Sequence, residues 1–279
     1  MYISALTVLI DDRKGSLRNK LFNSDANGSV TSPKYDPSIS AQILELEFSR
    51  KGKDIRQSIV EILYKRINEH TVDSKKVSSI STLFKKHSNT NIITTNYDTL
   101  LSDHILPGFS KVIIEGSPIP KSNIGGNVFH IHGCISNPKS IVFTINDYFR
   151  FQHKDSYLSR KFYTLLQETT VVILGYALGD FNLNSIFNEA QTSRAVSLRK
   201  GDIYLVSRSS VDEIYTNFYS YTYGIHVVEG YDIGEFFDKL DGFSTQAQEI
   251  VAEASNLPEV LNGKKIYTDN YLKLRDSLS

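Results

Sequence analysis

The chain has 279 residues, and 40% of them are hydrophobic. That is enough to bury a substantial core, arranged as one large domain or two small ones. Lys and Arg together number 31, as do Asp and Glu, so the formal net charge is zero. This balance gives no reason to expect a nucleic acid, a membrane surface or a polyanion as a partner.

The single cysteine, Cys134, excludes several kinds of cysteine-based site. One cysteine cannot form an internal disulfide, a CxxC pair or a thiolate zinc site. We therefore expect a reduced, cytoplasmic protein without zinc or another bound metal. No apolar run is long enough to cross a bilayer. The apolar N-terminus lacks the basic leader of a signal peptide and soon meets Asp11 and Asp12.

The N-terminal third is predicted to be mostly helical after an irregular start. Residues 7–10 are a candidate short strand, and residues 23–37 are rich in Ser, Asn, Asp, Gly and Pro, which predicts an exposed loop. Apolar residues then recur at helical spacing over 40–68, with a break at 51–52. A further short helix is expected at 80–84.

Beyond residue 90 the chain alternates between expected strands and helices. Several of the strands are apolar on both faces, as in a buried parallel sheet. This order predicts a doubly wound, Rossmann-like α/β fold with an additional helical segment toward the N-terminus. The expected domain is 1–243, with a mostly helical insert at 40–90 and the core at 91–230, and a helical tail follows at 244–279. The expected strands are 91–95, 111–115, 128–131, 171–174, 203–206 and 225–228, and a short apolar run lies at 141–144. The expected helices are 146–168, 180–190, 211–221 and 233–240, and Asn146 or Asp147 is expected to cap the first of them.

Three of the expected strands end in polar or glycine-bearing sequence. These ends are TTNYD at 94–98, HIHG at 130–133 and GYALGDFN at 175–182. In open α/β sheets, ligands bind beyond the carboxyl ends of the strands. We therefore expect the three ends to meet at one edge of the sheet and to form the binding site.

Asn96 and His132 are the candidate catalytic residues. The Asn96 amide can donate and accept hydrogen bonds, so it can orient a hydroxyl or a water, although a strand-end Asn can also serve only as a helix cap. His132 can act as a general base near neutral pH, or it can be a core histidine satisfied by a carbonyl. His130 lies two residues earlier and is the better candidate for a structural role.

The remaining candidates have equally plain structural alternatives. The glycine turn at 175–182 leads into a helix whose free N–H groups favour an anionic ligand, but every strand-to-helix crossover needs some turn. Asp180 is the expected N-cap of that helix. Cys134 follows His132 across Gly133, which breaks the strand, and no third group is present to orient a Cys–His pair; we interpret Cys134 as structural.

Taken together, four motifs resemble the sirtuin-like (SIR2-like) domain in order and spacing, over about residues 40–230. They are TTNYDTL at 94–100, FHIHG at 129–133, IVFTINDY at 141–148 and LGYALGDFN at 174–182. The sequence is most similar to the branch found in bacterial anti-phage defence proteins. The resemblance implies a Rossmann-like fold with NAD as the substrate, cleaved to nicotinamide and ADP-ribose. It also implies a homo-oligomer or a partner protein of a defence system.

The resemblance assigns roles to individual residues. Asn96 matches the residue that orients water or substrate near the nicotinamide ribose, and His132 matches the base that acts on a ribose hydroxyl. Breaking the nicotinamide–ribose bond chiefly requires a positioned water and removal of a proton, which Asn and neutral His can provide without a metal. The other residues expected to bind NAD are Thr95, Asp98, Gly133, Gly175, Tyr176, Asp180 and Asn182.

Two features depart from the family pattern. The four-cysteine zinc module of sirtuin deacetylases is absent, which favours NAD hydrolysis over protein deacetylation. A deacylase or an ADP-ribosyltransferase that acts on a protein is a third alternative. No Gly-Ala-Gly-x-Ser phosphate loop is found, because the candidate strand at 7–10 is followed by DDRKGS, whose two carboxylates disfavour phosphates. The chain therefore either begins downstream of that loop or carries a degenerate one. The alternative function is a catalytically weak or inactive scaffold, or a nucleotide-sensing subunit of a defence complex.

Overall fold

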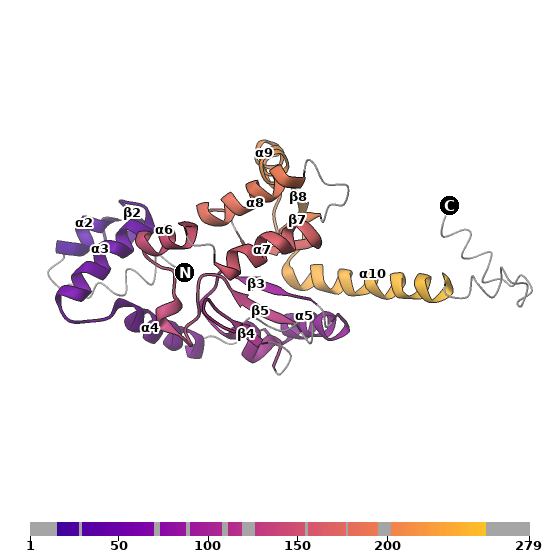
Figure 1. The fold of residues 1–279 in the computed structure, drawn as a ribbon, viewed down its shortest axis with the longest axis horizontal. Coiled ribbons are helices and arrows are strands. Elements are labelled where there is room, and N and C mark those ends of the chain that lie inside the picture. Colours follow the sequence, from indigo (N-terminus) through magenta and orange to yellow (C-terminus); the bar gives the residue numbers. More distant parts are fainter. Residues whose placement is uncertain are drawn as a thin grey trace, which may run out of the picture.

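The computed structural model describes residues 16–27, 30–69, 73–87, 90–107, 111–118, 126–153, 156–176, 178–194 and 202–254. The candidate strand at 7–10, most of the DDRKGS segment and the expected tail beyond residue 254 lie outside these ranges. Within them the chain is an α/β protein with two three-stranded parallel sheets and a helical N-terminal region (Figure 1).

The first parallel sheet carries two of the three predicted site motifs. Its strands lie in the order β3 (Ile92–Thr94), β5 (Asn127–His130) and β4 (Lys111–Ile113). In the β3/β5 register Thr94 is the partner of His130. Asn96 and His132 each follow two residues later, so the parallel register brings both residues to the same edge of the sheet.

The second sheet carries the third motif. Its strands are in the order β6 (Val171–Leu174), β7 (Ile203–Ser207) and β8 (Ile225–Glu229). One helix connects each pair, α8 (Phe181–Arg194) and then α9 (Glu213–Tyr223), as parallel pairing requires. The prediction of a parallel α/β core is confirmed, although the described strands form two sheets instead of one.

A shared hydrophobic cluster joins the two sheets to the helices between them. It contains Phe129 of the first sheet, Ile173 and Leu205 of the second, and side chains of α7 (Tyr157–Glu168) and α8. The rings of Phe162 and Phe187 meet edge to face across these two helices, with centroids 5.3 Å apart. The two sheets therefore share one continuous core.

The N-terminal region has a second core of its own. Helix α4 (Ile55–Glu69) and helix α3 (Pro37–Arg50) pack on the segment that follows His132, with Leu44, Ile59 and Phe143 fully or almost fully buried. The predicted break at 51–52 is the turn between these helices. Ahead of them lie α2 (Ser16–Leu21) and an antiparallel pair, β1 (Phe22–Ser24) and β2 (Val30–Pro33).

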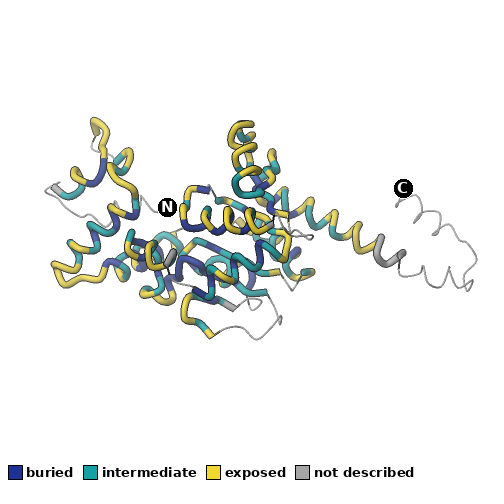
Figure 2. The backbone as a smooth tube through the Cα atoms, turned by 45° about the horizontal axis from the view of Figure 1, so that its top comes forward, coloured by how far each residue is buried: buried dark blue, intermediate teal, exposed yellow. Residues whose placement is uncertain are grey.

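Helices α5 (Ser74–Lys86) and α10 (Ile233–Ala254) pack against each other. Two ion pairs join them, Lys76 to Asp232 at the start of α10 (2.7 Å) and Lys86 to Asp241 (2.6 Å). Figure 1 shows α10 extending away from the sheets, and most of its residues between 242 and 249 are exposed (Figure 2).

Several expected boundaries were wrong. The helix expected at 146–168 is two helices, α6 (Ile145–His153) and α7, because the Ser156 hydroxyl accepts from Ser159 N and starts a new helix. Neither Asn146 nor Asp147 caps α6 from outside, since both lie in its first turn. The helix expected at 233–240 continues to 254, so the proposed boundary at 244 falls inside α10. The loop expected at 23–37 contains β1 and β2, and the run at 141–144 is irregular.

Candidate active site

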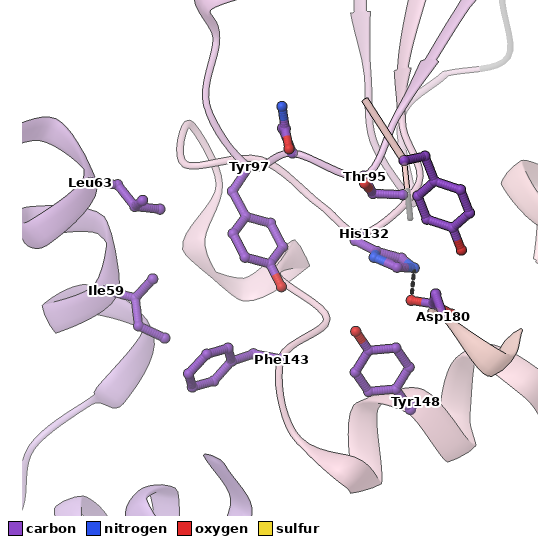
Figure 3. A pocket seen from close by; sticks show the side chains of 10 residues that line it. Ile59, Leu63, Thr95, Tyr97, His132, Phe143, Tyr148 and Asp180 are labelled. Atoms are coloured by element: carbon purple, nitrogen blue, oxygen red, sulfur yellow. Dashed lines mark ion pairs between the residues drawn. The ribbon is translucent and has the colours of Figure 1, made fainter. Parts of the chain in front are cut away.

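A cavity of about 200 Å³ lies where the predicted motifs meet (Figure 3). It is lined from three sides: by the segment after β3, by His132 and the chain that follows β5, and by the β6–α8 connection. The predicted convergence of the three strand ends is therefore realised. The ten lining residues are Ile59, Leu63, Thr95, Asn96, Tyr97, His132, Phe143, Tyr148, Tyr176 and Asp180.

Asn96 is held through its backbone and leaves its side chain available. Its N–H donates to Thr94 Oγ1 (3.0 Å), and its carbonyl lies 3.0 Å from His130 Nδ1. Because a carbonyl can only accept, His130 must carry its proton on Nδ1. Among the described residues the Asn96 carboxamide has no hydrogen-bond partner, so it is free to bind a ligand. His130 thus has the structural role expected for it.

His132 is only 3% exposed and lies in the turn directly after β5. Its ring meets the rings of Tyr148 and Phe151 edge to face, with centroids 5.6 and 5.7 Å away. Burial lowers the pKa of His132, and the nearby Asp180 carboxylate only partly opposes this effect. The imidazole is therefore neutral near pH 7, which is the state that a general base requires.

Asp180 has two functions in the structure. Its Oδ1 accepts from Asn182 N (3.0 Å) and Leu183 N (3.2 Å), so it caps α8 as predicted. Its Oδ2 faces His132 Nε2 at 3.5 Å (Figure 3). The helix cap thus presents the second carboxylate oxygen to the candidate base.

Three tyrosines form much of the remaining wall. Burial raises the pKa of Tyr97, Tyr148 and Tyr176, so all three remain protonated donors. The Tyr97 hydroxyl donates to the Val142 carbonyl (2.7 Å). Among the described residues the Tyr176 hydroxyl is buried and forms no well-aligned hydrogen bond, although the nearby Asp180 backbone partly opposes the rise in its pKa; such a group in a cavity is a candidate ligand contact.

Four predicted NAD-binding residues do not line the cavity. Asp98 is buried and accepts from Leu100 N (3.1 Å), and Asn182 donates its amide to the Tyr148 carbonyl (3.3 Å). Gly133 has φ +87°, and the space that its side chain would need is filled by the Ser140 backbone. Gly175, at φ +63°, enables the turn after β6.

Sequence reasoning missed five lining residues. Tyr97 lies in the TTNYDTL motif beside Asn96, and Tyr148 lies in the IVFTINDY motif. Their positions in these motifs could have indicated that they line the site. Ile59 and Leu63 come from α4, and only tertiary packing shows that their buried face reaches the cavity together with Phe143. Among the described residues, no group of three or more His, Cys, Asp and Glu side chains is arranged to hold a metal ion.

The fold and the site together define a Rossmann-like α/β protein with a cavity at the carboxyl ends of parallel strands, where such folds bind their ligands. The family model of the SIR2-like domain matches residues 90–228, which include all four motifs and both candidate catalytic residues. The chain belongs to the SIR2-like family.

One relative is similar to this chain over a longer stretch than the family model covers. The chain is similar to Defense-associated sirtuin 2 of Bacillus subtilis, with 20% identity over 244 residues, which is 85% of this chain and 23% of the relative. The chain thus spans about a quarter of the length of that relative. In the part of the chain that the structure describes, no helix is long and apolar enough to cross a membrane.

Proposed function

We propose that this chain is an NAD glycohydrolase of the sirtuin-like type, which cleaves NAD to nicotinamide and ADP-ribose in anti-phage defence. The observation that carries the proposal is the meeting of Asn96 and neutral His132 in one cavity, inside the region that matches the SIR2-like family. The defence role is supported by the name of the Bacillus subtilis relative.

The residues fit the requirements of the reaction. The bond between the ribose anomeric carbon and the pyridinium nitrogen breaks, its electron pair leaves with neutral nicotinamide, and the ribose develops oxocarbenium character. Asn96 orients the attacking water or the ribose, and His132 accepts a proton from a ribose hydroxyl. The oxygen of the water forms the new bond to the anomeric carbon, and one proton is released overall.

The charges of the cavity favour the nicotinamide end of the substrate. None of the ten lining residues is Lys or Arg, whereas four of them are aromatic: Tyr97, Phe143, Tyr148 and Tyr176. A pyrophosphate needs cationic or N–H partners, but a pyridinium ring and its ribose do not. The volume of about 200 Å³ also suits one end of a dinucleotide and not the whole molecule. We therefore propose that the nicotinamide riboside end enters and the phosphates remain outside.

The test is nicotinamide release from NAD by the purified chain, followed by chromatography, with and without the products of neighbouring genes. We expect Asn96→Ala and His132→Ala each to reduce release by about 100-fold or more. His226→Ala and Asn19→Ala are the matched controls, because both residues are exposed and neither lines the cavity, and both variants should release nicotinamide like the wild type. Equal release by all four variants would disprove the assignment of the site.

A second candidate function is a nucleotide-sensing or scaffold subunit without turnover. The cavity volume favours it, because ligand pockets usually enclose about 300–1,000 Å³ and this one is smaller. Calorimetric titration separates the two candidates: a sensor binds NAD without releasing nicotinamide, a scaffold does neither, and a hydrolase does both.

We also propose that the protein acts in the cytoplasm, where NAD is found, as a homo-oligomer or with a defence partner. The support is the similarity to a defence-associated relative, Defense-associated sirtuin 2. Light scattering coupled to gel filtration, with and without NAD, tests the oligomeric state. A monomer under every condition, active without a partner, would contradict this proposal.

A further inference from the structure

We propose that Asp180 is a positioning residue that holds His132 in the tautomer protonated at Nε2, which leaves Nδ1 as the basic nitrogen offered to the cavity. The role of Nδ1 as a base rests on the proposed NAD hydrolysis. The tautomer itself does not depend on that function and can be measured without substrate.

The direction of the Asp180 carboxylate is fixed by the helix that it caps. Both N–H groups that donate to Oδ1 belong to the first turn of α8, so rotation of the carboxylate would break two hydrogen bonds at once. The positive end of the helix dipole also favours the ionised form of a carboxylate at this position. The second oxygen, Oδ2, is therefore an oriented anionic acceptor that lies 3.5 Å from His132 Nε2.

Apart from Asp180, His132 Nε2 has no partner among the residues that the structure describes. It is among the buried side-chain atoms that lack a hydrogen bond, and a buried N–H without an acceptor is unfavourable. A carboxylate can only accept, so a lone pair on Nε2 would face negative charge, whereas an N–H on Nε2 would be attracted. The distance from His132 Nε2 to Asp180 Oδ2 is about 0.5 Å longer than a formed hydrogen bond. Hydrogen bonds in active sites are often this long without substrate and shorten when the substrate binds.

No other charged side chain among the lining residues competes for the imidazole. Tyr97, Tyr148 and Tyr176 face the same cavity, and their raised pKa values keep them neutral. The edge-to-face contacts with Tyr148 and Phe151 restrict the plane of the His132 ring. Arg56, at the start of α4, is paired with Glu45 and Asp147.

The second ring nitrogen has a different environment. Figure 3 shows it on the side of the imidazole away from Asp180. The buried polar atoms without a hydrogen-bond partner among the described residues include His132 Nε2 but not His132 Nδ1. With the proton on Nε2, the Nδ1 lone pair is available to a ribose hydroxyl in the cavity.

The test is nitrogen NMR of the full chain with ¹⁵N-labelled histidine, which distinguishes the two tautomers by their shifts and ring couplings, with His132→Gln to assign the signals. We expect Nε2–H in the wild type. Asp180→Asn keeps an oxygen for the helix cap but presents an NH₂ group to Nε2, so we expect the signals to switch to the Nδ1–H tautomer. A wild-type Nδ1–H tautomer, or no change in Asp180→Asn, would overturn the proposal.

Asp212→Asn is the control for capping, because Asp212 caps α9 in the same way, with Oδ1 accepting from Ile214 N at 2.8 Å, and lies outside the cavity. The two Asn variants should have similar unfolding midpoints, but only Asp180→Asn should lose kcat for NAD, by about 10-fold or more with little change in KM. Its remaining activity should persist to lower pH, because Asp180 raises the pKa of His132 against the effect of burial. A tautomer switch in a protein that does not cleave NAD would sustain the positioning role and refute the proposed function.

Discussion

Gly133→Ala tests how the backbone holds His132 in place. Gly133 has φ +87°, and an added Cβ would lie 2.2 Å from the Ser140 carbonyl oxygen and 2.7 Å from Ile141 N. Both atoms belong to the backbone of the turn that follows, so no side chain can rotate away to make room. Gly116 is a close match for a control, because its φ is +82° and nothing lies within 4 Å of the position of its missing Cβ.

Gly133→Ala and Gly116→Ala share the cost of a positive φ, but only Gly133→Ala adds a steric clash. Placing a non-glycine residue at positive φ costs about 1–2 kcal/mol at either site. At Gly133 the clash adds an overpacking penalty of about 1–3 kcal/mol, since the turn must move by about 1 Å. We therefore expect the free energy of unfolding to fall by about 2–5 kcal/mol in Gly133→Ala and by about 1–2 kcal/mol in Gly116→Ala.

Urea denaturation followed by circular dichroism measures both losses, provided that the slope of each transition is unchanged. Nicotinamide release should also fall in Gly133→Ala, because the His132 carbonyl accepts from Val142 N (2.9 Å) and cannot keep this contact if the turn moves. Equal destabilisation of the two variants would refute the reasoning, since it would show that the turn at Ser140 yields without penalty.

Two further substitutions separate binding from folding. In Tyr176→Phe a buried hydroxyl that has no well-aligned hydrogen bond to the described residues is removed, so the unfolding midpoint should not fall, while KM for NAD should rise by about 5- to 10-fold if that hydroxyl binds the substrate. In Arg56→Met both ion pairs of a largely buried guanidinium are lost and two carboxylates are left without it, so the free energy of unfolding should fall by about 2–4 kcal/mol. Arg50→Met removes a pair whose arginine side chain is 74% exposed and should change stability by less than about 1 kcal/mol, and denaturation that found equal losses for the two arginines would contradict this distinction.

The convergence of the site could be predicted because it depends on local signals. β-branched runs that end at Asn96, His132 and Gly175 predict buried strands with polar carboxyl ends, and parallel pairing then brings those ends together. The Asp180 cap was predicted from its position before the helix. Its second contact, with His132, could not be predicted, because it depends on how two sheets are placed relative to each other.

The errors in the elements have local causes of a different kind. The start of α7 at Ser156 interrupts a sequence without Gly or Pro, so a continuous helix was the simpler prediction for 146–168. The helical tail was expected to begin at 244, yet α10 continues through that position, and its first half is anchored on α5 by two ion pairs. The pairing of β1 with β2 rests on polar residues that lack the alternation typical of strands.

The hydrogen bonds around Asn96 and His132 indicate which side of the cavity can move. Ile131 N donates to the Thr94 carbonyl (3.0 Å), His130 Nδ1 to the Asn96 carbonyl and Ile135 N to the Tyr97 carbonyl (2.8 Å). The two segments that carry the candidate catalytic residues are therefore bonded to each other. This cross-linked pair holds its geometry before substrate arrives, as efficient positioning requires.

Asp180, Tyr148 and Tyr176 also line the cavity, and they come from α6 and from the connection between β6 and α8. Their described contacts with the cross-linked segments are ring contacts and the 3.5 Å approach of Asp180 to His132, both of which adjust more easily than backbone hydrogen bonds. If His132 is to gain a formed hydrogen bond from Nε2, the approach must therefore come from the α8 side. Substrate binding is expected to draw the start of α8 toward a fixed imidazole, and not the imidazole toward the helix.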